Sequence, residues 1–219
     1  MLPIQLRSPA PAVCATPSQN VDLSTHASAP IDPVMSELNA LIGGKFVLVF
    51  IGFSGQGYQD QTRLDKQLTR IMQQAIEAHG EANVVVVAGA TKDGIGRCYE
   101  IAKDPFNLQT IGIVSELGMA YTSQQCDKAV YVSDPDKRWQ VRTPDNTASY
   151  MVSVAEKHGE MHALGGGAIA IEELKEALER GIACKIIDDF MPGRPSDPAH
   201  PMPLNTWHQS IAVTASQQP

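Results

Sequence analysis

The stretch EMHALGGGAIAIEELKEALERG, from Glu160 to Gly181, joins a short apolar segment to a helical pattern through three consecutive glycines. The first part is mostly apolar and short, as expected of a strand buried in a sheet. The second part has apolar residues at helical spacing, and they form one stripe made of Ala170, Ile171, Leu174, Ala177 and Leu178. The stretch therefore predicts a strand, a glycine turn and a helix, the repeating unit of an α/β protein.

The same alternation extends outward from this stretch through most of the chain. Nearly continuous apolar runs predict strands at residues 45–53, 83–90, 109–117, 128–134, 160–167 and 183–189. Apolar residues at helical spacing predict helices at 34–44, 63–80, 94–104, 147–159 and 168–181. We predict an α/β fold with a doubly wound, mainly parallel Rossmann-like sheet and helices on both faces.

Composition divides the chain into three parts. Residues 1–33 are rich in Pro, Ser, Thr and Ala without periodicity and predict a disordered or loosely packed N-terminal arm. Residues 34–190 hold the Rossmann-like domain, and residues 191–219 form a Pro-rich tail with Trp207 as its large aromatic residue. No apolar run is long enough to cross a bilayer, and the first residues lack the apolar centre of a signal peptide. We expect a cytoplasmic protein without a membrane partner.

Charge and cysteine usage exclude further classes of protein. The 24 acidic residues outnumber the 17 basic ones, which gives a formal net charge of −7 without a Lys/Arg cluster. Nucleic acid is therefore not expected as a partner, because its binding requires a basic surface. The four cysteines are widely spaced and form no C-x-x-C pair. We expect reduced thiols, no metal site and no separate cofactor.

Glycine-rich turns follow the first, second and fifth predicted strands. In an open parallel sheet, ligands bind beyond the carboxyl ends of the strands. Glycines let a ligand approach the backbone, and the following helix N-terminus offers unpaired N–H groups to an anion. We predict that the three turns face one cleft for a phosphorylated ligand. Its candidate residues are Gly52, Ser54, Gly55, Gly57, Gly89, Thr91, Gly94, Gly165, Gly166, Gly167, Ala168 and Ala170.

Two known phosphate-binding motifs are absent from these turns. The first turn has the spacing G-x-x-G-x-G instead of the dinucleotide fingerprint G-x-G-x-x-G. The pattern G-x-x-x-x-G-K-[ST] does not occur either. The sequence therefore favours neither hydride transfer to NAD nor a P-loop.

A carboxylate follows the third glycine turn closely. The helical wheel places Glu173 at the border of the apolar stripe, and Glu172, Glu176 and Glu179 on the solvated face. A border carboxylate can accept hydrogen bonds from ribose hydroxyls while the glycine backbone holds a phosphate. The alternative is a first-turn carboxylate that only favours the helix dipole. The first interpretation predicts a small phosphorylated, ribose-containing ligand, such as a nucleoside monophosphate or a relative of ADP-ribose.

Two segments, GATKDGIGRCYEIA (89–102) and GGGAIAIEEL (165–174), resemble motifs of the LOG family. This family contains Rossmann-like proteins once labelled lysine decarboxylases and belongs to the SLOG superfamily of binders of nucleotide-related ligands. The resemblance covers residues 45–188, with Gly166 and Gly167 on the paired glycines and Glu173 on the motif glutamate. It implies a nucleotide-binding domain that forms a homo-oligomer, with a dimer as the first expectation.

The chain departs from the family at the phosphate turn and at the catalytic pair. The family proline falls on Gly165, its third glycine on Ile169 and its threonine on Ala170. Thr147 and Ala148 stand where the family carries an Arg-Lys pair. In family enzymes that arginine acts with the glutamate in cleaving the N-glycosidic bond of a nucleoside monophosphate. The resemblance therefore implies a retained cleft with half of the catalytic pair missing.

Three functions remain open at this point. A sensor or scaffold would bind the nucleotide-like ligand without turnover. A phosphoribohydrolase would use Glu173 as its catalytic residue, with Arg138 or Arg142 from the loop DKRWQVRTPDN supplying the missing cation. A protein-interaction module would instead use the Pro-rich arms.

Overall fold

The computed structural model describes residues 31–193, which hold a six-stranded sheet of order β4-β3-β2-β1-β5-β6. Every pair of neighbouring strands runs parallel. The strands are β1 (Phe46–Gly52), β2 (Val84–Ala88), β3 (Gln109–Ser115), β4 (Lys128–Val132), β5 (Gly159–Leu164) and β6 (Cys184–Ile187). The predicted α/β class and parallel sheet are confirmed. Most of the two predicted arms, including Trp207, lies outside the described residues.

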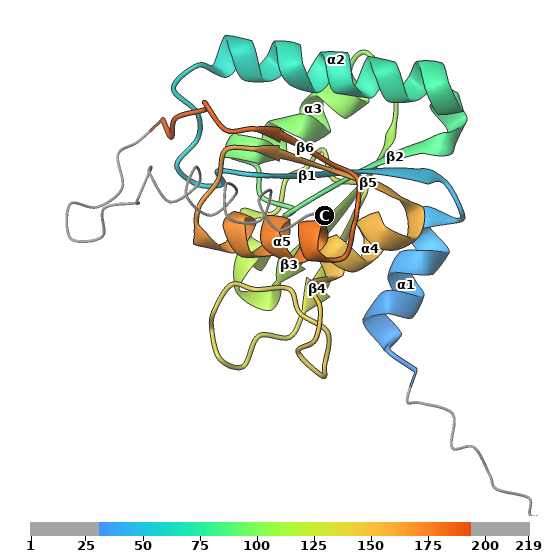
Figure 1. Ribbon diagram of the computed structural model, residues 1–219, viewed down its shortest axis with the longest axis vertical. Helices are drawn as coiled ribbons and strands as arrows, with labels where there is room; N and C mark the ends of the chain where they lie inside the picture. The colour runs from blue at the N-terminus through green and yellow to red at the C-terminus, as the bar shows by residue number, and fades with distance from the viewer. Residues whose placement is uncertain (1–30, 194–219) are drawn as a thin grey trace, which may run out of the picture. The chain divides into compact units, whose positions relative to one another are not determined.

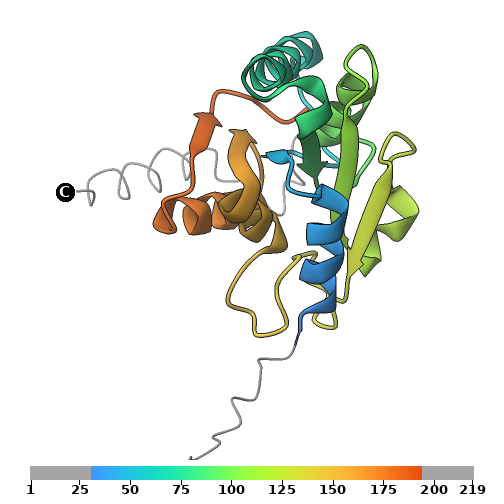
Figure 2. The same cartoon turned by 90° about the vertical axis from the view of Figure 1, so that its right-hand side faces the viewer.

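Helices cover both faces of the sheet, as predicted. One face carries α1 (Pro33–Ile42), α4 (Tyr150–His158) and α5 (Ala168–Glu179), and the other carries α2 (Gln61–His79) and α3 (Arg97–Lys103) (Figure 1). Three short 3-10 turns complete the path, η1 (Glu81–Asn83), η2 (Gly94–Gly96) and η3 (Glu116–Tyr121). Helix α1 lies beside β4 and α4 (Figure 2). Among residues 31–193, no helix is long and apolar enough to cross a membrane.

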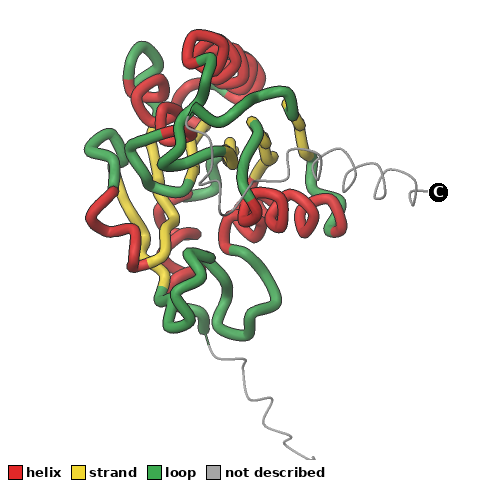
Figure 3. The backbone as a smooth tube through the Cα atoms, turned by 90° about the vertical axis from the view of Figure 1, so that its left-hand side faces the viewer, coloured by secondary structure: helices red, strands yellow, loops and turns green. Residues whose placement is uncertain are grey.

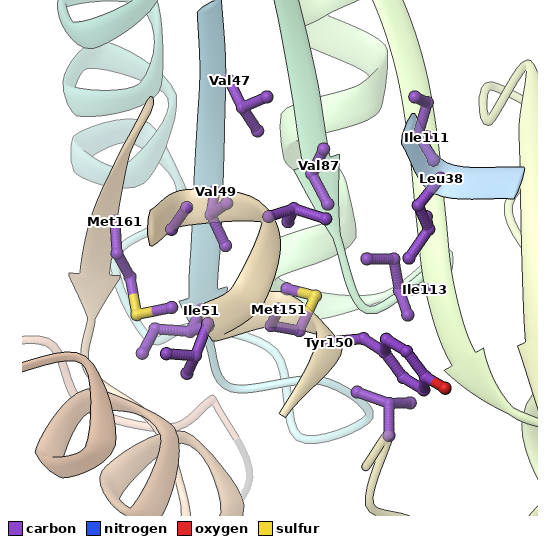
Figure 4. Packing of buried hydrophobic residues seen from close by; sticks show 14 of the residues in the cluster. Leu38, Val47, Val49, Ile51, Val87, Ile111, Ile113, Tyr150, Met151 and Met161 are labelled. Atoms are coloured by element: carbon purple, nitrogen blue, oxygen red, sulfur yellow. The ribbon is translucent and has the colours of Figure 1, made fainter. Parts of the chain in front are cut away.

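The apolar runs form strands because both of their faces are covered. All five residues of β2 are buried, as are the five central residues of β1. Alternate residues of each strand enter different clusters, since successive side chains point to opposite faces. Figure 4 shows one cluster, in which Leu38, Val49, Ile113 and Met151 meet from a helix, two strands and a second helix.

The order of the strands determines where a ligand can enter. After β1 the chain continues through β2 and β3 to β4 on one side, and then crosses to place β5 on the other side of β1. Residues Val47–Gly52 of β1 pair with Gly159–Leu164 of β5. The connections that leave these two neighbours run over opposite faces, through α2 and α5. This is the switch point at which doubly wound sheets open a crevice.

The start of the predicted C-terminal tail packs against the loop after β1. The N–H of Gln59 donates to the carbonyl of Met191 at 3.1 Å, and the N–H of Gly193 donates to the carbonyl of Gly57 at 3.0 Å. Pro192 forms an isolated bridge with Tyr58. Residues 191–193 therefore lie at the carboxyl ends of the strands, next to the loop that follows β1.

Candidate functional site

A cavity of about 440 Å³ lies at the carboxyl ends of the strands. Figure 3 looks onto this edge, where the loops gather in front of the strand ends. The predicted site residues that line the cavity are Gly52, Ser54, Gly55, Gly89, Thr91, Gly167, Ala168, Ala170 and Glu173. The structure thus brings together residues from all three predicted turns, with the β1 turn and the start of α5 on either side of the switch point.

Four of the predicted glycines do not line this cavity. Gly94 has a φ of 63°, and an added Cβ would lie 2.1 Å from the carbonyl oxygens of Phe53 and Ser54. Gly165 has a φ of 64°, and an added Cβ would lie 2.6 Å from the ring of Phe53. Both glycines allow neighbouring turns to approach closely. Gly57 closes the first turn by donating to the carbonyl of Ser54 at 3.0 Å, and Gly166 continues the third turn with a φ of 140°.

Helix α5 begins at the cavity without a side-chain cap. Its N-cap is Gly167, which has extended backbone angles and no side chain to accept a hydrogen bond. The first intrahelical bond runs from Ile171 N–H to Gly167 C=O at 3.0 Å. The N–H groups of residues 168–170 therefore have no partner inside the helix, and they lie at the positive end of its dipole. This is the arrangement that receives an anion in many α/β proteins.

Glu173, predicted at the border of the apolar stripe of α5, lies in the cavity wall and is more buried than a border position suggests. The residue is buried, and its Oε1 accepts a hydrogen bond from Ser149 Oγ at 2.8 Å. Burial raises the pKa of Glu173 to about 7, and the nearby carboxylates of Glu176 and Glu172 add to this, whereas Ser149 and Arg142 lower the value. The N-terminal end of α4 covers Glu173, a contact that a helical wheel of α5 alone does not include.

Glu176 also departs from its predicted solvated position. Its carboxylate is only 15% exposed and accepts hydrogen bonds from Arg142 Nη1 and the N–H of Ser149, each at 3.0 Å. Arg180 forms a further ion pair with it at 3.3 Å. The long loop between β4 and α4, the yellow segment below the sheet in Figure 1, supplies Arg142 and Ser149, whereas Arg180 is the C-cap of α5 itself.

The two arginines proposed as cations do not line the cavity, although their chain neighbours Trp139 and Val141 do. Both border a second hollow, of about 420 Å³, inside the loop between β4 and α4. Arg142 is held by Glu176 and by the carbonyl of Asn146, and the exposed Arg138 lies 3.7 Å from Asp136. Among the described residues that line the cavity, none is Lys or Arg. The expectation that one of these arginines points into the cleft is therefore not met.

Tyr58 was not predicted as part of the site, although it joins the two strands of the switch point. Its hydroxyl accepts from Phe53 N–H at 3.1 Å and donates to the carbonyl of Leu164 at 2.7 Å. The side chain is buried, and burial raises its pKa well above the ordinary value. Since Tyr58 and Leu164 are 106 residues apart, no local pattern marks this contact.

The remaining wall of the cavity combines apolar side chains with a few polar groups. The apolar part is supplied by Phe50, Ile51, Phe53, Ile95, Ile113, Val114, Trp139, Val141, Met151 and Ile169. Gln56 and Ser115 add polar groups that the sequence analysis missed. No cluster of His, Cys, Asp and Glu suited to a metal ion occurs within residues 31–193.

Comparison with known proteins relates the fold to solved structures. No protein-family model and no curated protein matches the sequence. A molybdenum cofactor binding protein from Rippkaea orientalis is 16% identical, with a TM-score of 0.52, over 79% of this chain and 86% of the other. A molybdenum cofactor carrier protein from Chlamydomonas reinhardtii is 15% identical, with a TM-score of 0.49, over 77% and 86%. The similarity shows a related Rossmann-like fold, and membership of the LOG family in particular stays a prediction.

Proposed function

We propose that this domain binds a small phosphate ester of a planar heterocycle and holds it without efficient turnover. Nucleoside monophosphates, the ligands predicted from the sequence, have this chemistry. The molybdenum cofactor, a pterin with a phosphate ester, has it too and is what the protein from Rippkaea orientalis binds. The observation that carries the proposal is the cavity at the β1–β5 switch point, which the uncapped start of α5 borders.

The phosphate end of the ligand would lie against the start of α5. The N–H groups of residues 168–170, which have no partner inside the helix, and the helix dipole favour an anion there, a dipole effect worth about 0.3 to 2 kcal/mol. The glycines of the first and third turns leave the backbone accessible. Because none of the lining residues within the described part of the chain is cationic, backbone N–H groups and the Ser54 and Thr91 hydroxyls would supply the donors.

The heterocycle would lie against the apolar part of the wall. A volume of about 440 Å³ falls in the range typical of small-molecule sites, which are mostly apolar with a few orienting polar groups. Glu173 and Ser115 lie in this wall and can orient the ring or the sugar. The cavity therefore suits a ligand with one anionic end and one flat apolar end.

Hydrolysis of a nucleoside monophosphate is the second candidate, because a buried carboxyl group lines the cavity. With a pKa raised to about 7, Glu173 can gain or lose a proton near neutral pH, as an acid or base catalyst must. However, Arg142 forms an ion pair with Glu176, and Thr147 and Ala148 stand where the LOG family has its cationic pair. The missing cation favours binding over turnover.

A thermal-shift titration tests the binding function. The probes are AMP, GMP, CMP, a phosphorylated pterin and inorganic phosphate, each compared with the unphosphorylated nucleoside or pterin. Ligands that bind only the folded state raise its stability by about 2.7 kcal/mol at 100 times Kd. We expect a rise in Tm with phosphate esters and a much smaller one with their unphosphorylated forms. The absence of any shift at millimolar concentration would overturn the proposal.

Chromatography of the same monophosphates after incubation distinguishes the two candidates. Intact nucleotides together with a thermal shift support binding without turnover. Release of free base by the wild type, lost in Glu173→Gln, would replace that proposal with the hydrolase.

Self-association into a homo-oligomer, a dimer in the first instance, belongs to the same proposal. Sedimentation velocity of the purified chain tests it, and a monomer at tens of micromolar would contradict it. The third function considered, protein interaction through the Pro-rich arms, concerns segments that lie mostly outside residues 31–193.

A further inference from the structure

We infer that Trp139 is the ring-stacking residue of the cavity and that Asp134 positions it. The inference rests on the proposed function and deepens it, because it assigns recognition of the heterocycle to one side chain. Trp139 belongs to the long loop between β4 and α4 and lines the cavity together with the start of α5. The ring and the phosphate would thus be held by different elements.

The indole is packed on one side and exposed overall. An added Cβ on Gly118 of η3 would lie 3.7 Å from Cζ3 of Trp139, and the ring of Tyr121 lies 6.4 Å away between centroids. Trp139 nevertheless keeps 48% of its surface exposed, beside a cavity that it borders. A large aromatic group that contacts η3 and keeps about half of its surface exposed at a cavity wall is suited to stack on a planar ligand.

The backbone at Trp139 is in a conformation that tryptophan rarely adopts. Its φ is 61°, in the left-handed region, where a bulky residue is strained and glycine is not. A turn that served only to reverse the chain would be better made with Gly or Asn at this position. Strain retained at a residue that lines a cavity points to a role for its side chain.

Asp134 holds this strained turn in place. The carboxylate accepts from Trp139 N–H at 2.7 Å, from Arg138 N–H at 3.0 Å and from Ser115 Oγ at 2.9 Å. Although burial favours the neutral acid, the hydrogen bonds from Arg138, Ser115 and Trp139 keep the pKa of Asp134 below its ordinary value. Since Ser115 is the last residue of β3, the carboxylate ties the turn to the sheet. Through these hydrogen bonds, Asp134 fixes the position of Trp139 relative to the end of β3, which lines the cavity.

Tryptophan fluorescence gives a direct test, since the sequence contains only two tryptophans. In a Trp207→Phe background, Trp139 becomes the only reporter. We expect AMP, GMP and a phosphorylated pterin to quench it saturably. Inorganic phosphate is expected to raise the Tm without quenching. A thermal shift with heterocyclic esters and no quenching would overturn the inference and leave the proposed function standing.

Substitutions at position 139 measure the contribution of the ring. Trp139→Gly relieves the backbone strain, so it is expected to fold at least as well as wild type. We expect Trp139→Gly to lower the affinity for heterocyclic phosphate esters roughly 10- to 100-fold and to leave the affinity for inorganic phosphate unchanged. Trp139→Phe keeps an aromatic ring, so its affinity for heterocyclic phosphate esters should fall less than that of Trp139→Gly. Tyr131→Ala, which removes an exposed aromatic group outside the cavity wall, is the control and should bind as wild type.

Asp134→Ala tests the positioning role separately. Loss of the carboxylate is expected to lower the fluorescence anisotropy of Trp139 and the affinity for heterocyclic phosphate esters. The affinity for inorganic phosphate should be unchanged. Asp134→Asn keeps one acceptor oxygen, so its anisotropy and its affinity for heterocyclic esters should lie between those of Asp134→Ala and wild type. Wild-type affinity for heterocyclic esters in Trp139→Gly would overturn the inference alone, whereas failure of every phosphate ester to bind wild type overturns the proposed function and the inference together.

Discussion

Glu173 illustrates how burial changes the chemistry of a single residue. A charged carboxylate beside a phosphate would repel it, yet this side chain lies in the same cavity wall as the start of α5. Because burial raises its pKa to about 7, a large fraction of the group is neutral near neutral pH. A neutral carboxyl adds no repulsion and can donate a hydrogen bond. The carboxyl group and an anion site can therefore occupy the same wall.

Glu173→Gln is expected to change the pH dependence of stability. The folded-state pKa, about 7, lies above the ordinary value of 4.5, so the unfolded chain loses its proton first as pH rises. Wild-type stability should therefore fall between pH 4.5 and 7 and then level off. The variant lacks this loss of stability. Its free energy of unfolding should therefore exceed that of wild type by near zero at about pH 4 and by roughly 1 to 3 kcal/mol at about pH 8.

Urea unfolding at several pH values measures this difference. Glu172→Gln, one position earlier on the exposed side of α5, controls for the loss of a carboxylate. Parallel pH profiles for wild type and Glu173→Gln would contradict the expectation.

At the scale of elements, the site depends on where α5 starts and on how β1 and β5 are joined. The start of α5 is accessible because its N-cap residue is a glycine. The ends of β1 and β5 are joined by the Tyr58 hydroxyl, and an added Cβ on Gly52 would lie 2.1 Å from that oxygen. The start of α5 therefore has no side-chain cap at the cavity, while the Tyr58 hydroxyl links the ends of β1 and β5 beside it.

Gly167→Asp separates stability from binding at this helix start. The new carboxylate can accept from the N–H of Ile169 or Ala170 and so cap α5, which should raise stability by about 0.5 kcal/mol. The same carboxylate occupies the anion position, so affinity for phosphate esters should fall about tenfold or more.

Thermal unfolding and ligand titration of Gly167→Asp check both parts. Gly44→Asp makes the same charge change before β1, at the opposite end of the strands; the φ of 79° at this position should lower its stability, but its affinity should be unchanged. Wild-type affinity in Gly167→Asp would show that the ligand does not use this helix start.

Tyr58→Phe tests the junction between β1 and β5. The substitution removes the partner of a buried N–H and of a buried carbonyl, so it should destabilise the domain by about 1 to 3 kcal/mol. Tyr131→Phe removes an exposed hydroxyl that contacts Thr122 and should cost much less. Chemical denaturation of both variants measures the difference, and equal costs would argue against a structural role for the Tyr58 hydroxyl.

At the scale of the whole domain, two apolar clusters on opposite faces share one sheet. Leu174 of α5 lies in one cluster and Leu68 of α2 in the other, and both are almost completely buried. Every strand of the sheet pairs with its neighbour in one continuous ladder. Loss of packing on either face should therefore weaken the same cooperative unit.

Leu68→Ala and Leu174→Ala are each expected to cost about 2 to 5 kcal/mol. Urea unfolding followed by circular dichroism and by tryptophan fluorescence should show one transition with the same midpoint for both probes. Lys66→Ala, on the exposed side of α2, controls for truncation without a cavity. Separate midpoints for the two probes would show that the faces unfold independently.

The sequence by itself determined the alternation of strands and helices, the parallel sheet and the glycine turns at its carboxyl edge. These features follow from local periodicity and from the short range of turn geometry. The tertiary structure alone decided that Glu173 is buried, that Arg142 pairs with Glu176 and that Trp139 borders the cavity. All three depend on the loop between β4 and α4 folding back over α5, a long-range contact with no periodic signal. Residues distant in the chain meet there, and their burial and charge pairing are set only by that meeting.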